Sequence, residues 1–261
     1  MLCINAMTNK LRIATCQFPV SHHITKNTKF IKRLIKKAAE AAAGAVHFPE
    51  TALPGYGRTD FTSAHIDNWQ ELEDERQKIT EAARKFGLWV ILGSCRKITH
   101  NEKPTNCVHV ISDQGKIVGT YDKQKLTASE SNFYSSGKGF LDVTINGIKC
   151  GFLICYEACF PALFETYRKR GVRLIFHSCY NVSRKPRPLF QELTMAQFRT
   201  RAADNQMWIS ASNSSAQYTF STACIARPDG SIRRLRKHRS GILLHDFPDT
   251  ELGWTYDNRI N

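Results

Sequence analysis

The chain has 261 residues, and its 37 lysines and arginines against 23 aspartates and glutamates give a formal net charge of +14. Its 42% apolar and 10% aromatic content is typical of a folded protein and argues against disorder. No apolar run approaches the roughly 20 residues of a membrane-spanning helix, and residues 1–10 lack the apolar segment of a secretory signal. The composition therefore predicts a soluble, cytoplasmic protein without membrane contact.

The N-terminal part of the chain alternates between strand and helix patterns. Short apolar runs typical of buried strands occur at 11–17, 45–49 and 88–94. Apolar residues recur at helical spacing over 25–43 and 71–86. This alternation of strands and helices predicts a layered α/β fold.

The rest of the chain contains two predicted hairpins and then further alternation. The hairpins turn at 112–115 and at Asn146-Gly147, the second being the strongest local turn signal. Further helices are expected over 161–170 and 188–205, with strands over 174–177, 208–212, 219–227, 231–235 and 241–245. Because neither a flexible linker nor a repeat interrupts the pattern, residues 1–261 are predicted to form a single domain.

The nine cysteines argue for free thiols. Their number is odd and none forms a C-x-x-C pair, whereas zinc sites usually contain closely spaced ligand pairs. The closest group, Cys150, Cys155 and Cys159, does not have that spacing. We therefore expect no metal site and a reducing compartment.

The positive charge lies in separate clusters over 32–37, 184–187 and 233–239. Aromatic residues do not alternate with the basic ones as they do in single-strand binders. Helix-turn-helix, RNP and zinc-finger signatures are also missing from the sequence. We interpret the clusters as solvated faces of a basic protein and expect no nucleic-acid partner.

Three polar residues follow predicted strands: Glu50, Lys123 and Cys155. Ligands of α/β folds bind at the carboxyl ends of strands, and a cysteine that opens a turn after a strand resembles a nucleophile elbow. Each residue alone is more often structural, as a turn carboxylate, a charged strand end or an inert buried thiol. Together they supply a base, a cation and a nucleophile for one mechanism.

Longer motifs surround these residues. They are Pro49-Glu50 with Gly55-Tyr56, Tyr121-x-Lys123-x-x-Leu126, and Gly151-x-x-Ile154-Cys155-Tyr156-Glu157. Their order and gaps resemble the nitrilase superfamily, the carbon–nitrogen hydrolases, and Gln17, Asn106, Gly115, Arg201-Ala202-x-x-Asn205 and Pro228-Asp229-Gly230 also match that family's pattern. The resemblance covers almost the whole chain.

The resemblance implies a four-layer α-β-β-α sandwich and a catalytic triad of Glu50, Lys123 and Cys155. It implies a supporting carboxylate at Glu130 and assembly as a homodimer or a larger homo-oligomer. The chain departs from the family at Cys159, which occupies a position where the family often has arginine, and at Ser129, which replaces a frequent glycine. Neither change affects the three reacting groups.

The residue types suggest how an amide would be hydrolysed. We expect Lys123 to lower the pKa of the Cys155 thiol, and Lys123 and the backbone N–H of Tyr156 to hold the oxyanion. Glu50 would transfer protons, which requires a pKa raised by burial. Neither a metal nor an organic cofactor is needed.

The substrate prediction is a small amide, with N-carbamoyl amines and nitriles as alternatives. Specificity is expected from the loops 56–68, 131–138 and 179–188, the last carrying Arg184, Lys185 and Arg187. These basic residues either attract a substrate carboxylate or form an ordinary solvated loop. Alternatives of other classes are a papain-type enzyme using His177 or another histidine with a cysteine, an inactive relative and a basic nucleic-acid-binding protein.

Overall fold

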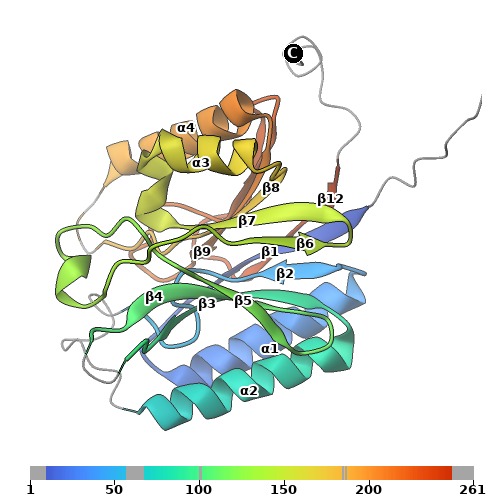
Figure 1. Ribbon diagram of the computed structural model, residues 1–261, viewed down its shortest axis with the longest axis vertical. Helices are drawn as coiled ribbons and strands as arrows, with labels where there is room; N and C mark the ends of the chain where they lie inside the picture. Colours follow the sequence, from blue (N-terminus) through green and yellow to red (C-terminus); the bar gives the residue numbers. More distant parts are fainter. Residues whose placement is uncertain (1–9, 57–67, 100–101, 184, 186, 249–261) are drawn as a thin grey trace, which may run out of the picture.

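The computed structural model describes residues 10–56, 68–99, 102–183, 185 and 187–248 (Figure 1). Its first half contains β1 (Leu11–Phe18), α1 (Ile24–Glu40), β2 (Ala45–His47), α2 (Trp69–Phe86), β3 (Trp89–Arg96), β4 (Thr105–Ile111) and β5 (Ile117–Asp122). Its second half contains β6 (Asp142–Ile145), β7 (Ile148–Ile154), α3 (Pro161–Lys169), β8 (Leu174–Ser178), α4 (Pro188–Asn205), β9 (Trp208–Ser214), β10 (Cys224–Ala226), β11 (Ile232–Arg234) and β12 (Gly241–Phe247).

The strands form two facing layers. Along one continuous hydrogen-bonded path they follow the order β5-β4-β3-β2-β1-β9-β8-β7-β6, and the contact between β1 and β9 joins the two halves. In Figure 1, α1 and α2 cover the outer face of the half that contains β3 and β4, while α3 and α4 cover the half that contains β7 and β8. The predicted four-layer α-β-β-α sandwich is confirmed.

Side-chain alternation divides the core of the sandwich. Ile13 of β1 and Ile91 of β3 pack with residues of β7, β8 and β9 in one buried cluster. Their neighbours in sequence, Ala14 and Val90, pack instead with residues of α1 and α2 in a second cluster. Because successive side chains of a strand point to opposite faces, both faces of this sheet are apolar.

Strand direction brings the functional segments to one edge. Parallel pairing of β3, β2, β1, β9, β8 and β7 places all their carboxyl ends on the same side. β5 runs in the direction of β3, since two successive antiparallel pairings through β4 reverse the chain twice. The segments after β2, β5 and β7 therefore meet at this edge.

One predicted strand is mostly wrong. Of the expected strand over 219–227, only β10 forms a strand, and Thr219 makes an isolated antiparallel bridge with Val182. The Thr219 hydroxyl lies 3.1 Å from the carbonyl oxygen of Asn181 and 2.8 Å from that of Ser221. The bond to Ser221 is local and the bond to Asn181 reaches the segment after β8, and together they hold Thr219 and its neighbours as a loop there.

Among the described residues, no helix combines the length and the apolar character that crossing a bilayer requires.

Candidate active site

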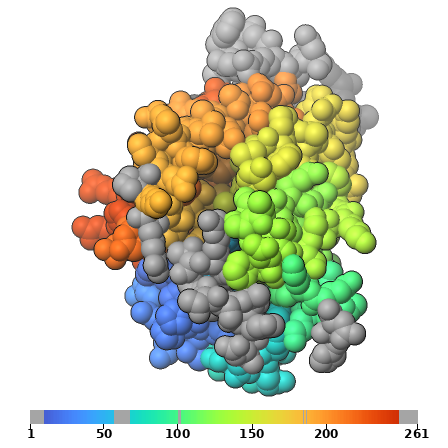
Figure 2. All heavy atoms as spheres, turned by 90° about the vertical axis from the view of Figure 1, so that its left-hand side faces the viewer, coloured from blue at the N-terminus to red at the C-terminus, as the bar shows by residue number. Residues whose placement is uncertain are grey.

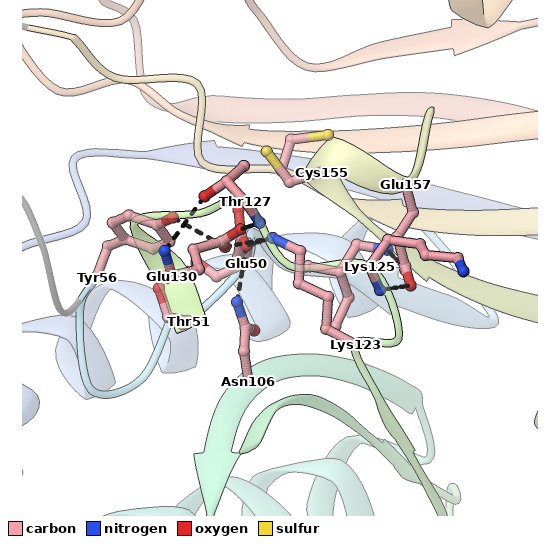
Figure 3. Close-up of polar contacts among 12 residues, drawn as sticks. Glu50, Thr51, Tyr56, Asn106, Lys123, Lys125, Thr127, Glu130, Cys155 and Glu157 are labelled. Atoms are coloured by element: carbon pink, nitrogen blue, oxygen red, sulfur yellow. Dashed lines mark hydrogen bonds and ion pairs between the residues drawn. The ribbon is translucent and has the colours of Figure 1, made fainter. Parts of the chain in front are cut away.

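The carboxylate of Glu50 is completely buried just beyond the end of β2. Its Oε1 atom accepts hydrogen bonds from Lys123 Nζ at 2.7 Å and from Asn106 Nδ2 at 2.8 Å (Figure 3). Its Oε2 atom is buried and has no hydrogen-bond partner among the described residues. One oxygen is thus held in place while the other is available for proton transfer.

The backbone before Glu50 lies in close contact with Gly93 of β3. A Cβ atom added to Gly93 of β3 would lie only 1.8 Å from the carbonyl oxygen of Pro49. The absence of a side chain at Gly93 therefore allows the chain before Glu50 to pass directly over β3.

Lys123 lies between two carboxylates. Besides Glu50, its ammonium contacts Glu130 Oε1 at 2.5 Å, and the lysine is 1% exposed. Burial by itself lowers the pKa of Lys123, but the negative charges of Glu50 and Glu130 outweigh it and raise that pKa well above its usual value. The lysine is consequently a fixed cation rather than a base.

Glu130 anchors the lysine from its second side. Its Oε1 atom also accepts from the Tyr56 hydroxyl at 2.9 Å, and its Oε2 atom accepts from the Thr127 backbone N–H at 2.8 Å. Burial favours a raised pKa for Glu130, yet the charge and hydrogen bond of Lys123 reverse the effect and lower it. In contrast, burial dominates for Glu50, whose pKa is raised, with the charge of Glu130 adding to the shift.

Cys155 begins the turn after β7 with a left-handed backbone, φ 45°. Its thiol donates to Asn181 Oδ1 at 3.5 Å, and the Cys179 thiol donates to the carbonyl oxygen of His177 at 3.7 Å. The pKa of the Cys155 thiol is raised well above its usual value by the neighbouring Cys179 thiol, by burial and by the charge of Glu50. Lys123 acts in the opposite direction but is outweighed, so the expectation of a lowered pKa was wrong for the resting protein.

Glu157 is a buried residue whose importance was missed from the sequence. Its Oε1 atom accepts from the backbone N–H groups of Gln124 and Lys125 at 2.8 and 3.2 Å and from the Tyr121 hydroxyl at 2.8 Å. Its Oε2 atom accepts from the Ile154 N–H at 2.7 Å, and burial raises its pKa to about 7. Glu157 thus ties the segment after Lys123 to the strand before Cys155; its place in the cysteine motif was the available signal.

A second buried polar network supports the segment before Glu50. His47 contacts the hydroxyls of Ser210, Ser178 and Ser212 at 2.9, 3.0 and 3.1 Å. Ser178 and Ser212 also donate to the carbonyl oxygen of Phe48. Burial lowers the pKa of His47 well below its usual value, so this side chain is a neutral structural residue.

The papain-type alternative is wrong. The His177 ring lies 3.1 Å from the backbone carbonyl oxygen of Cys155 rather than against its thiol. It also packs against Phe164 and Phe198, and burial lowers its pKa to about 4. His177 therefore lacks the geometry of a base for this cysteine.

A cavity of about 770 Å³ opens beside Cys155. Figure 2 shows the molecular surface hollowed between the orange spheres of α4 and the yellow-green part of the chain. The described lining residues are Tyr56, Thr127, Phe133, Cys155, Tyr156, Ala158, Cys159, Cys179, Tyr180, Asn181, Val182, Ser183, Arg187, Phe190, Leu193, Thr194, Gln197, Phe198 and Phe220.

The predicted specificity loops account for part of this lining. Tyr56, Phe133, Arg187 and the lining residues from Cys179 to Ser183 belong to them, whereas residues 57–67, 184 and 186 lie outside the described residues. Tyr156, predicted to support catalysis through its backbone, is 37% exposed and lines the cavity. The contribution of α4 was missed, since only the tertiary structure brings this helix to the site.

Comparisons with known proteins agree with this arrangement. The family model described as "Carbon-nitrogen hydrolase" matches residues 12–250. This α/β sandwich with an acid, an amine and a thiol at one strand edge belongs to the carbon–nitrogen hydrolase family, as the sequence motifs predicted.

Similar individual proteins include Nitrilase homolog 2 of Dictyostelium discoideum, 26% identical over 235 residues that span 83% of this chain and 70% of that protein. Omega-amidase NIT2 of Danio rerio is 27% identical over 223 residues, spanning 82% and 77%. The crystal structure of an amidase from Nesterenkonia sp. superposes with a TM-score of 0.78 at 19% identity and covers 93% of this chain and 92% of that one. This last likeness establishes the fold.

Proposed function

We propose that this protein hydrolyses the carbon–nitrogen bond of a small amide through a thioester on Cys155. The observation that carries the proposal is that the two carboxylate oxygens of Glu50 are bonded differently. Lys123 and Asn106 hold Oε1, while the buried Oε2 is without a partner among the described residues. A carboxylate with one fixed and one open oxygen near a thiol is arranged for proton transfer.

Acylation begins with attack of the Cys155 sulfur on the amide carbonyl carbon. Because the resting thiol is protonated, Glu50 removes its proton as the carbon–sulfur bond forms. The developing oxyanion is stabilised by Lys123 and by the backbone N–H of Tyr156. Two neighbouring carboxylates keep Lys123 charged and in position, so little reorganisation accompanies the reaction.

Collapse of the tetrahedral intermediate breaks the carbon–nitrogen bond. Glu50 returns the proton to the leaving nitrogen, and a primary amide releases ammonia. A water molecule then attacks the thioester, and Glu50 takes a proton from this water. Cys155 regains its proton when the carboxylic acid departs. The net reaction consumes one water and requires neither a metal nor an organic cofactor.

Two further carboxylates serve as positioning residues. Glu130 holds Lys123 against Glu50, and Glu157 connects the backbone on both sides of the reacting pair. The same arrangement suits N-carbamoyl amines and nitriles, which remain alternative substrates. The similarity to the omega-amidase of Danio rerio supports the amide as first choice.

The decisive experiment is an ammonia-release screen over ω-amides, N-carbamoyl compounds and nitriles. We expect turnover of an amide by the wild-type protein, none by Cys155→Ala, and an acyl adduct on the Cys155 peptide by mass spectrometry. Thermal unfolding of Cys155→Ala verifies that the variant is folded. Substantial hydrolysis by this variant refutes the covalent route. If none of the tested compounds releases ammonia and Cys155 stays unmodified, the result supports the inactive alternative.

We further propose that the enzyme works in the cytoplasm as a homodimer or larger homo-oligomer. The cytoplasmic proposal is supported by the eight described cysteines, all of which are free thiols. The oligomer proposal rests on the family resemblance, and light scattering coupled to gel filtration tests it.

A further inference from the structure

The cavity beside Cys155 has an apolar wall formed mainly by α4. Phe190, Leu193 and Phe198 lie on one face of this helix at helical spacing, and Phe220 meets Phe190 edge-on with ring centroids 6.2 Å apart. Phe190 and Leu193 remain 49% and 50% exposed although they line the cavity. Covering this surface with an apolar ligand group is favourable.

Charged groups are scarce around the same cavity. Among its described lining residues only Arg187 carries a charge. This exposed guanidinium lies over the Phe190 ring at 5.3 Å and donates to the Ser183 hydroxyl. Cys159, an exposed cysteine, also lines the cavity.

From this lining we infer that the substrate amides carry a large apolar acyl group, alkyl or aryl, rather than a short chain ending in a carboxylate. The inference rests on the proposed amide hydrolysis and specifies the substrate class of that site. The volume of about 770 Å³ far exceeds the needs of acetamide and falls within the range of pockets for drug-sized ligands.

A series of primary amides tests this inference. We expect kcat/KM to rise about threefold to fourfold per methylene from butanamide to hexanamide. We also expect 3-phenylpropanamide to exceed succinamate, which ends in a carboxylate. Faster turnover of succinamate overturns the inference while leaving the proposed function intact. Absence of ammonia from every amide contradicts the proposed function itself.

Two leucines of α4 provide a matched pair of variants. Leu193 lines the cavity, whereas Leu189 is 77% exposed and is not among the lining residues. Leu193→Ala should lower kcat/KM for hexanamide about threefold to tenfold, and Leu189→Ala should not. Cys159→Arg should raise the rate with succinamate relative to hexanamide. Equal losses in both leucine variants, or no change of preference with Cys159→Arg, contradict the apolar assignment.

A different observation concerns the thiol beside Cys155. The last paired residues of the parallel strands β7 and β8 are Ile154 and Ser178, so Cys155 and Cys179 follow at adjacent positions. Neighbouring strands lie about 4.8 Å apart, within the Cα separations that disulfides span. Both cysteines also line the cavity.

We propose that Cys179 is a resolving thiol for oxidised Cys155. Glu50 would take the proton of the Cys155 thiol, and the sulfur would then accept one oxygen atom from a hydroperoxide. The products are a sulfenic acid and, once the proton has been returned, water or an alcohol. Attack by the Cys179 sulfur then forms the disulfide and releases water, so that two thiols reduce one peroxide. The disulfide blocks the nucleophile reversibly and prevents irreversible oxidation to the sulfinic acid.

Peptide mapping after hydrogen peroxide treatment tests this second proposal without relying on activity. The wild-type protein should yield a Cys155–Cys179 peptide that has lost two hydrogens and separates in dithiothreitol. Cys179→Ala should instead accumulate sulfinic acid at Cys155, whereas Cys159→Ala should still form the disulfide. A Cys155 that becomes a sulfinic acid equally in the wild type and in Cys179→Ala, or a disulfide to another cysteine, overturns the proposal.

Discussion

Replacement of Glu130 by glutamine tests how charge controls the proposed base. Lys123 Nζ lies 2.7 Å from Glu50 Oε1 and 2.5 Å from Glu130 Oε1, so these carboxylate oxygens are no more than about 5 Å apart. At an effective dielectric constant of about 20, two negative charges at that separation repel by about 3 kcal/mol. Glu130→Gln removes this repulsion and makes Glu50 a weaker base.

The acidic limb of the kcat/KM–pH profile should therefore move to lower pH by about two units, since this limb reports the base of the free enzyme. The assay is ammonia release from the best amide between pH 4 and 9. Glu165→Gln is the control, because Glu165 is exposed and paired with Lys169 on α3. A limb that stays in place or moves to higher pH refutes the electrostatic reasoning.

Two further substitutions test how the site is positioned. Gly93→Ala should destabilise the protein by about 2 kcal/mol or more and abolish activity, because the new Cβ collides with the Pro49 carbonyl. The control is Gly139→Ala, which has open space around the new Cβ and should unfold like the wild type in urea. Glu157→Gln should lower the stability by about 1–3 kcal/mol and reduce kcat, since its amide would turn an N–H group toward the Ile154 N–H. An unchanged urea midpoint with either variant contradicts the corresponding contact.

Much of the layered architecture could be predicted from local patterns. Strand alternation, helical spacing and the Asn146-Gly147 turn act within a few residues, so most elements were placed within two or three residues of their observed bounds. The prediction of a strand over 219–227 was mostly wrong because the Thr219 hydroxyl donates a hydrogen bond to the carbonyl oxygen of Asn181, a residue distant in sequence. Membership of the carbon–nitrogen hydrolase family is confirmed, while the catalytic roles of Glu50, Lys123 and Cys155 stay a prediction.

Sequence alone determined which reactive groups follow the strands, because backbone periodicity and residue type are local properties. Only the tertiary structure decided their environment: which oxygen of Glu50 lacks a partner, that burial and its neighbours raise the pKa of the Cys155 thiol, and that Cys179 lies beside it. It likewise brought the aromatic face of α4 to the cavity. Burial and through-space charge depend on segments far apart in the chain, and no short motif encodes them.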